Sequence, residues 1–276
     1  MLKLTKDNYF SLEASRQYMS VSQFKGFVPA YGGCEAASVA KLSGEWVEPK
    51  KDAFEEGKYI HAWNEGTLAE FRANNPDMIS SQGPTKGQLK ANFKHCNRMI
   101  EVLENDPLVM KVLAGQKEVI LTANLFGIAW KIMIDSYQPE SGHFGVITDL
   151  KAMKEMDGKW WNKEAQAYEN FIEHYGYKIQ MAIYAEIERL AKGRKPEQWA
   201  LPHMAIITKE KSPDHELLFF DFEVIAQQLQ IVSKYIERVK LVKSGVETPV
   251  RCEKCEYCLQ DKKLQRIRHY SEMNLY

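Results

Sequence analysis

The sequence lacks the features that mark membrane, secreted and repetitive proteins. No run of about 18 uncharged apolar residues is present, so we expect no membrane-spanning helix and no membrane partner. The N-terminal stretch MLKLTKDNYFSLEAS lacks the apolar core of a secretory signal peptide. No internal repeat or low-complexity tract is visible. We therefore expect an intracellular, cytoplasmic protein.

The chain also lacks an excess of either charge. Lys and Arg together number 37, and Asp and Glu also number 37, so the formal net charge is zero. Hydrophobic residues make up 45% of the 276 residues, which excludes a disordered chain, a collagen-like fibre and a disulfide-dense miniprotein. A polybasic nucleic-acid coat is excluded as well. A nuclease is not excluded, because it needs positive charge only along a groove.

The order of the expected elements indicates a mixed α/β layer structure. Helices are expected over 19–28 (capped by Ser20 or Ser22), 34–42, 50–72, 88–104, 107–114, 163–191 and 223–242, with a loop over 74–88. Strands are expected from 118, over 127–135, over 144–150 after a turn at 136–143, and within ALPHMAIITKE and HELLFFDF. We expect one catalytic domain, with a helical N-terminal elaboration (1–115), a sheet core (116–222) and a C-terminal part (223–276).

Cysteine is scarce, and three of the five cysteines form a C-x-x-C-x-x-C motif at Cys252, Cys255 and Cys258. In a reducing compartment this spacing indicates a metal site rather than disulfides. A closed site needs a fourth ligand, for which Cys34 is the best candidate and Cys96 the other. All-thiolate ligation suits either a [4Fe–4S] cluster or Zn²⁺. The alternative is three free cysteines in a mobile tail.

Three residues at strand ends are typical of metal-dependent phosphate chemistry. Side chains alternate along a strand, so Asp149 and Lys151 face the same side, with Cα atoms about 7 Å apart. The turn at 136–143 can bring Asp135 alongside Asp149. Two adjacent carboxylates repel each other unless a cation lies between them, and Mg²⁺ favours such oxygen ligands. The alternative is a turn-initiating Asp135 and a surface ion pair between Asp149 and Lys151.

Two further motifs lie on expected helices. GKYIH ends in His61, and QMAIY contains Gln180 and Tyr184 at the i,i+4 spacing that places both on one helix face. Taken alone, His61 is more often a core or surface residue than a metal ligand. Tyr184 can equally pack on the sheet, and Gln180 can fill a polar gap. Only the order of these motifs around the two acidic strands indicates a shared site.

That ordered set resembles the RecB-like branch of the PD-(D/E)XK nuclease superfamily, and is most similar to the phage-type RecE-like exonucleases. The motifs of the branch appear in order as GKYIH, KIMID, DLK and QMAIY. The segments MSVSQF, CEAASVAKLSGEW and RCEKCEYC also resemble that group, so the resemblance spans residues 18–260. It implies a PD-(D/E)XK, restriction-endonuclease-like core, in which a mixed sheet is flanked by helices.

The resemblance also implies roles for single residues. Mg²⁺ or Mn²⁺ would be held by His61, Asp135, Asp149 and the backbone carbonyl of Leu150. Lys151 would be the catalytic lysine, while Gln180 and Tyr184 would orient the site or contact the DNA backbone. Glu118 is a weaker candidate for a supporting carboxylate, because a solvated strand end explains it equally well. Two departures are Ala152, where relatives often carry Thr or Ser, and the long turn between the two aspartates.

For the cysteines, the resemblance is to RecB-like nucleases with an iron–sulfur staple. In those proteins one cysteine precedes the nuclease core and three follow it, which matches Cys34 with the C-terminal three. On this basis we favour a [4Fe–4S] cluster over Zn²⁺, although the C-terminal spacing is tighter than usual. Loss of such a site should loosen the fold, because it closes a loop of most of the chain.

The activity implied is that of a Mg²⁺-dependent DNA exonuclease acting on linear duplex ends. It would resect the 5′ strand during phage-type recombination, for a RecT-like single-strand annealing partner, and relatives form homo-oligomeric rings. A phage-encoded protein in a bacterial host fits this picture. One alternative is a single-strand-end nuclease of the CRISPR-adaptation type. Another is a non-catalytic DNA-binding module with a structural metal.

Two groups of residues are candidates for DNA contact. The tail 260–270 reads as a solvated basic helix or as a phosphate-binding segment through Lys262, Lys263, Arg266 and Arg268. Trp160 and Trp161 can stack on an exposed base or pack against the following helix. In both cases the structural interpretation is the more frequent one.

Overall fold

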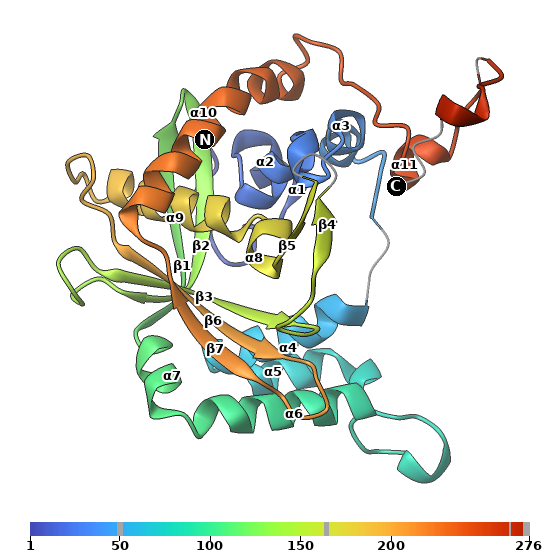
Figure 1. Cartoon of the computed structure of the whole chain (residues 1–276). Helices are drawn as coiled ribbons and strands as arrows, with labels where there is room; N and C mark the ends of the chain where they lie inside the picture. The colour runs from blue at the N-terminus through green and yellow to red at the C-terminus, as the bar shows by residue number, and fades with distance from the viewer. Residues whose placement is uncertain (49–51, 163–165, 265, 273–276) are drawn as a thin grey trace.

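A computed structural model describes residues 1–48, 52–162, 166–264 and 266–272 of the chain (Figure 1). Its centre is a five-stranded sheet in the order β1-β2-β3-β6-β7. The strands are β1 (Gln116–Leu125), β2 (Ile128–Gln138), β3 (Val146–Met153), β6 (Leu201–Thr208) and β7 (His215–Phe219). Only β3 and β6 pair in parallel among these neighbours. The mixed sheet confirms the predicted fold class.

Helices cover both faces of the sheet (Figure 1). On one side lie α1 (Leu12–Gln17), α2 (Val21–Phe27), α3 (Glu35–Ser43), α9 (Tyr177–Ala191) and α10 (Phe222–Lys243). On the other side lie α4 (Asp52–Glu65), α5 (Leu68–Asn74), α6 (Ala91–Glu104) and α7 (Pro107–Val112). None of the helices within the described ranges is long and apolar enough to cross a membrane.

The apolar side chains divide into a core on each face of the sheet. Trp130 and Ile132 of β2 are fully buried with Ile183 of α9 and Ile236 of α10. The second core joins Leu150 of β3 to the helices α4, α6 and α7. The helices are amphipathic with one apolar stripe each, so the sheet is buried between two helical layers. The candidate site described below lies at the middle strands of the sheet, where the two helical layers meet it.

Two expected helices are wrong in part. The helix expected over 50–72 is interrupted at Gly66, whose φ of 84° ends α4 and lets α5 start in a new direction. Within the expected helix over 163–191, residues 167–169 form a strand instead. This strand, β5 (Ala167–Glu169), pairs with β4 (Trp160–Asn162). Residues 50–51 and 163–165 of these two predictions lie outside the described residues.

The chain between β5 and α9 is also more broken than expected. After β5 comes a short helix, α8 (Phe171–His174), and Gly176, with φ of 60°, separates it from α9. Trp160 stacks on His174, with ring centroids 4.9 Å apart and planes at 13°, so tertiary packing outweighs the local helix propensity of this segment. The result is a small hairpin that stands beside the N-terminus of α9 (Figure 1).

The C-terminal tail also differs from the basic helix that the sequence indicates. A short helix, α11 (Glu256–Leu259), ends before the basic residues, and only the turn Tyr270–Glu272 follows in the described part of the tail. Residue 265 lies outside the described residues. Arg266 pairs with Glu272 at 2.5 Å, and Lys262 donates to the carbonyl of Glu253 at 2.9 Å. One local ion pair and one hydrogen bond to the backbone therefore occupy two of the side chains expected to contact DNA.

Candidate active site

The hairpin of β2 and β3 brings the two aspartates together. β2 continues to Gln138, so Asp135 lies within the strand and the turn at 136–143 was placed too early. The last paired residues before the strands separate are Ser136 and Thr148, which makes Asp135 and Asp149 the next facing positions. Both carboxylates are buried. The predicted proximity of the two side chains is therefore present, although through a longer strand than expected.

Asp135 is fixed by groups from two elements. Its Oδ2 accepts a 2.6 Å hydrogen bond from the backbone N–H of Leu150, the residue after Asp149 on β3. Its Oδ1 lies 3.3 Å from Nδ1 of His61, which projects from α4. One oxygen is thus used to orient the carboxylate, while the other faces the imidazole. This division holds Oδ1 in a defined place for a ligand.

Glu118 lies opposite Asp135 on the neighbouring strand. The pairs Lys117–Ser136 and Val119–Ile134 flank these two residues in the antiparallel register of β1 and β2. Glu118 has a φ of 53°, a left-handed conformation that costs a non-glycine residue roughly 1–2 kcal/mol. Such strain persists where the surrounding structure imposes it, and it gathers at functional sites.

The left-handed residue interrupts the alternation of side chains along β1. In a regular strand residues two apart share a face, as Val119 and Leu121 do against the core beside α9. Lys117 instead donates to Asn64 of α4 at 2.7 Å, on the opposite side of the sheet. The strand therefore changes face at Glu118, and this twist aims its carboxylate at the same point as that of Asp135.

Three residues of this group fit a hard divalent cation. His61, Glu118 and Asp135 each offer a ligand atom, and these atoms all lie within 4.8 Å of one another. One nitrogen and two carboxylate oxygens leave positions for water and phosphate oxygens around an octahedral ion. Glu118, the weaker candidate from the sequence, belongs to this group. Asp149 is not part of this group of three described residues. Its carboxylate interacts with Lys151 instead.

Asp149, Lys151 and Gln180 form a second cluster next to the first. Nζ of Lys151 lies 2.8 Å from Oδ2 of Asp149 and 3.0 Å from its Oδ1, as the shared strand face predicts. Nε2 of Gln180 donates to the same Oδ1 at 2.5 Å from α9. The buried carboxylate is thus held by a lysine of its own strand and by a glutamine of α9. The arrangement places an ammonium group directly beside the possible metal ligands.

The charges of the two clusters are strongly interdependent. Burial alone would lower the pKa of His61, but the adjacent Asp135 raises it to about 9. Burial and the facing Asp135 raise the pKa of Glu118 to about 7. Burial opposes the ammonium form of Lys151, yet Asp149 and Asp135 outweigh it and raise the pKa of Lys151. In the absence of a metal ion, a protonated imidazole therefore compensates the carboxylate of Asp135.

Tyr184 of α9 faces the carboxylates from the core side of the sheet. Burial, followed by the negative groups around it, raises its pKa well above 10, so the phenol stays neutral and can donate a hydrogen bond. Its ring also packs with the core of α9 and α10, as the structural interpretation of QMAIY anticipated. The i,i+4 spacing thus does place Gln180 and Tyr184 toward the same site.

Sequence motifs did not reveal Lys25 as a lysine near the site. Nζ of Lys25, on α2, lies 5.9 Å from the centroid of the Tyr177 ring, and Nζ of Lys151 lies 5.6 Å from the same centroid. Lys25 gave no signal in the sequence, because a lysine in an amphipathic helix is common.

Four cysteines also lie close together beside the N-terminus of α3. Sγ of Cys34 lies 3.5 Å from that of Cys258, and Cys252 lies 3.9 Å from Cys258. With Cys255, these residues offer sulfur atoms that all lie within 4.8 Å of one another, a group that could hold Zn²⁺ or an iron–sulfur cluster. Cys96 lies in the second core, between helices α4 and α6.

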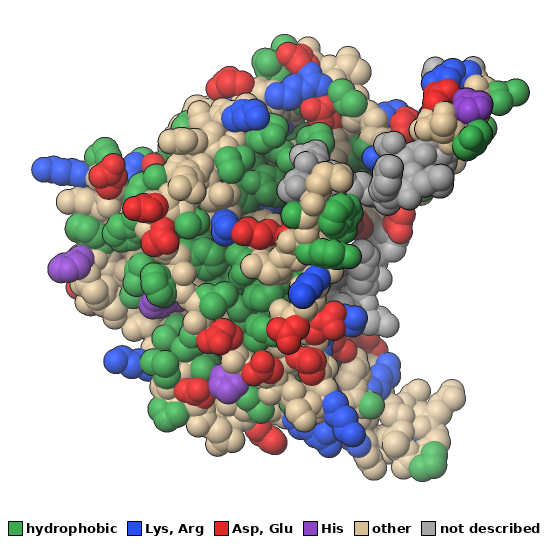
Figure 2. All heavy atoms as spheres, viewed as in Figure 1, with side chains coloured by type: hydrophobic (Ala, Val, Ile, Leu, Met, Phe, Trp, Pro, Cys, Tyr) green, Lys and Arg blue, Asp and Glu red, His purple; other side chains and the backbone are tan. Residues whose placement is uncertain are grey.

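The tryptophans divide between packing and exposure. Trp160 stacks on His174, whereas Trp161 remains 45% exposed next to Tyr168, across the hairpin. Lys and Arg side chains lie scattered among acidic ones over the face that Figure 2 shows.

Comparison with known proteins shows the family to which this fold corresponds. Residues 20–261 match the family described as PDDEXK-like domain of unknown function (DUF3799). A solved structure from Eubacterium rectale, described as "Putative exonuclease", is 36% identical, covers 100% of this chain and 99% of its own, and has a TM-score of 0.88. The structure of SSO0001 is 12% identical over 92% of this chain and 94% of its own, with a TM-score of 0.34. None of the curated proteins matches the chain.

The family match and the similarity to the Eubacterium rectale structure support a nuclease. A PDDEXK-like nuclease fold implies use of a divalent metal. The matched range includes His61, both aspartates, Lys151 and all four clustered cysteines. The chain therefore belongs to the family of PDDEXK-like domains.

Proposed function

We propose that this protein is a metal-dependent DNA exonuclease that hydrolyses phosphodiester bonds from the ends of linear duplex DNA. The observation that carries the proposal is the meeting of His61, Glu118 and Asp135 beside the Asp149–Lys151 pair. Two carboxylates from adjacent strands need a cation between them, and an ammonium group at their side suits a phosphate substrate.

Each residue of the site would have a distinct task. His61, Glu118 and Asp135 would hold Mg²⁺ or Mn²⁺, with Asp149 and the carbonyl of Leu150 as further oxygen ligands. The ion would neutralise phosphate charge and lower the pKa of a coordinated water. Lys151 would stabilise charge that develops on the scissile phosphate. Gln180 would keep Asp149 oriented toward the metal ion. Tyr184 would donate a hydrogen bond from its hydroxyl group to an oxygen at the site.

The deciding experiment is digestion of end-labelled linear duplex DNA with and without Mg²⁺. We expect nucleotides to be released only with the metal and only from linear DNA, with closed circles intact. The Lys151→Ala protein should lose the activity while keeping the unfolding temperature of the wild type. Release by the wild type in excess EDTA, or by Lys151→Ala at the wild-type rate, would reject the proposed site. A non-catalytic DNA-binding module would give no release at all.

Direction of cleavage and partners follow from the family resemblance. We propose 5′-to-3′ resection, which leaves a 3′ overhang for a RecT-like annealing protein, in phage-type recombination by a homo-oligomeric ring. Separate 5′ and 3′ labels on the same duplex test the direction. Preferential degradation of single strands would instead favour the CRISPR-adaptation type of activity.

We also propose that Cys34, Cys252, Cys255 and Cys258 bind a structural metal ion. Four sulfurs at about 2.3 Å from one zinc ion lie roughly 3.8 Å apart in a tetrahedron. The distances of 3.5 and 3.9 Å fit this spacing. An iron–sulfur cluster places several iron atoms between its thiolates and so needs them farther apart. The sulfur geometry therefore favours Zn²⁺ over the [4Fe–4S] cluster that the sequence resemblance favours.

A further inference from the structure

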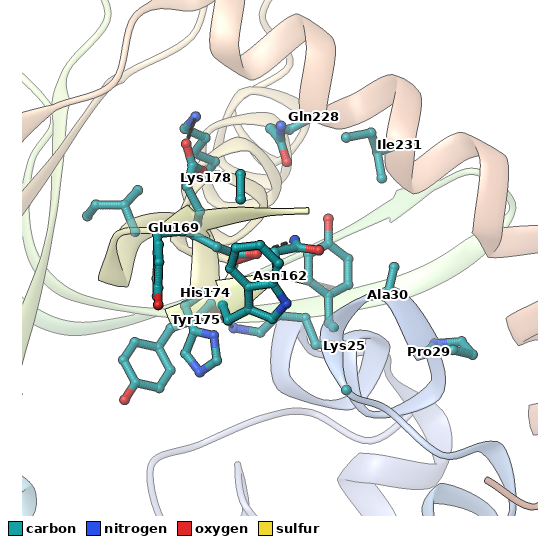
Figure 3. Close-up of a pocket in the computed structure, with 18 residues that line it drawn as sticks. Lys25, Pro29, Ala30, Asn162, Glu169, His174, Tyr175, Lys178, Gln228 and Ile231 are labelled. Atoms are coloured by element: carbon teal, nitrogen blue, oxygen red, sulfur yellow. Dashed lines mark hydrogen bonds and ion pairs between the residues drawn. The ribbon is translucent and has the colours of Figure 1, made fainter. Parts of the chain in front are cut away.

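A large cavity opens beside the candidate active site. Its volume is about 990 Å³, near the upper end for ligand-binding pockets. The hairpin of β4 and β5 forms one wall, and the chain from Lys25 to Gly32 forms another. Figure 3 shows Gln228 and Ile231 entering from α10 and Lys25, Pro29 and Ala30 from the N-terminal helices. None of the residues given a catalytic role above lines this cavity.

The cavity is nevertheless only one aromatic ring away from the catalytic lysine. Lys25 lines it, and the Tyr177 ring lies near the ammonium groups of both Lys25 and Lys151, with its centroid 5.9 and 5.6 Å from them. Burial, and then repulsion by Lys151, lowers the pKa of Lys25 to about 8. Nζ of Lys25 donates to the carbonyl of Tyr175 at 2.9 Å. Such a cation gains stability when an anion arrives near it.

Exposed aromatic rings line the opposite wall. Trp161 and Tyr168 face each other across the hairpin, with centroids 5.3 Å apart, and are 45% and 69% exposed. Tyr175 is 44% exposed at the same cavity. Because side chains alternate along a strand, anchoring Trp160 on His174 displays Trp161 on the other side. The hairpin thus holds apolar ring faces in contact with water.

Exposed rings beside a cation are the features that bind unpaired nucleotides. Aromatic faces stack with bases without regard to sequence, and lysines contact the phosphates. Within a duplex the bases are stacked on one another and only the outer face of the terminal pair is free, whereas a separated strand offers both faces of each base. The cavity therefore fits a strand whose end has separated from its complement. A purely apolar ligand would place no negative group beside the half-buried ammonium of Lys25.

We propose that this cavity binds the unpaired bases of the DNA strand next to the scissile phosphate, by stacking on Trp161 and Tyr168, while Lys25 contacts the backbone between cavity and active site. The proposal rests on the nuclease function proposed above and adds to it the state of the substrate. The duplex end has to open by a few base pairs before cleavage. The cavity would then hold the separated strand in place.

The test uses a short single-stranded oligonucleotide that carries a fluorescent adenine analogue, with Ca²⁺ in place of Mg²⁺ to limit cleavage. Wild-type protein should quench the analogue, because stacking on an aromatic ring quenches it. Trp161→Ala combined with Tyr168→Ala should abolish the quenching and weaken binding by about 5-fold to 100-fold. The single substitution Trp161→Phe, which keeps an aromatic ring at this position, should retain most of the wild-type affinity.

The matched control is Phe219→Ala, because Phe219 is an aromatic residue of the edge strand β7 with a similar exposure of 68%. It should bind the oligonucleotide as the wild type does. Unchanged affinity and quenching in the double variant, with an unchanged unfolding temperature, would overturn the cavity proposal. Equal, Trp161-dependent binding of a blunt duplex would overturn the requirement for unpaired bases.

The same preparations separate this inference from the proposed function. If the wild type releases nucleotides with Mg²⁺ but the double variant binds normally, only the cavity proposal fails. If the wild type binds through Trp161 and Tyr168 but never cleaves DNA, the nuclease function fails and the strand-binding cavity is supported. On a substrate that already has a single-stranded end, the double variant should show a raised KM with kcat nearly unchanged.

Discussion

The backbone N–H of Leu150 donates a 2.6 Å hydrogen bond to Oδ2 of Asp135 across the separation of β2 and β3. This contact couples the first acidic residue to the strand that carries the other acidic residue and the lysine. It leaves Oδ1 facing His61 at 3.3 Å. This hydrogen bond therefore links the position of the metal ligands to the strand that carries Lys151.

Replacing Asp135 with Asn should abolish DNA cleavage. The amide keeps the size of the side chain but removes the negative charge that binds the cation. We expect a fall in kcat of at least about 100-fold, comparable with the loss of one transition-state contact. Quantified nucleotide release at saturating Mg²⁺ measures it. Wild-type rates in Asp135→Asn would show that the cation lies elsewhere.

Gln180→Leu should lower activity by roughly 10- to 100-fold, the usual range for a residue that orients a ligand. Leucine has a similar volume but cannot donate the 2.5 Å hydrogen bond to Asp149. The loss should be in kcat, and a higher Mg²⁺ concentration should be needed for half-maximal rate. Gln227→Leu, an exposed glutamine on α10, is the control and should behave as the wild type. An effect on KM for DNA alone would indicate a DNA contact instead of an orienting role.

The parts of the site that the sequence could predict depend on local geometry. Asp149 and Lys151 are two residues apart on one strand, so their contact follows from alternation alone. Glu118 received a low rank because its left-handed φ, and the change of face that this causes, cannot be read from residue types. Lys25 reaches the site only through the packing of α2 against α9, a contact between distant segments.

The fold shows the same division between local and tertiary information. The order of strands and helices was predictable, because hydrophobic periodicity changes clearly at the start of β1. The hairpin of β4 and β5 was missed, because its segment contains good helix-forming residues and depends on the stacking of Trp160 on His174. Tertiary contacts of this kind override propensity and leave no periodic signal.

The stabilisation of the folded protein by Mg²⁺ should increase with pH. The pKa of His61 is raised from 6.5 to about 9 and that of Glu118 from 4.5 to about 7. A raised pKa stabilises the folded protein below the unfolded-state value and loses that contribution as the pH rises through the folded-state value. The metal-free protein thus loses these contributions between about pH 4.5 and pH 9.

Metal binding works in the opposite sense, because the ion needs a neutral imidazole and an ionised carboxylate. Thermal melts with and without Mg²⁺ should show a small increase in unfolding temperature near about pH 6 and a larger one near about pH 9. Titration calorimetry in buffers of different ionisation enthalpy should show proton release on binding at about pH 7. An increase that is constant over this range would contradict ligation by His61 and Glu118.

Cys34→Ser should remove the structural metal and loosen the whole fold. The site joins residues 224 positions apart, Cys34 and Cys258. Closing a loop of this length restricts the unfolded chain by about 5 kcal/mol in the entropic model for a cross-link. For a chain of this size the unfolding temperature should then fall by about 10 to 20 °C.

Elemental analysis of the purified protein gives the second readout. We expect close to one zinc per chain in the wild type, none in Cys34→Ser, and no visible absorbance from iron–sulfur chemistry. Cys96→Ala is the matched control, because Cys96 is buried but lies outside the group of four, so the metal content should stay unchanged. A brown protein with iron and sulfide in equal amounts would instead establish the cluster and reject the argument from sulfur spacing.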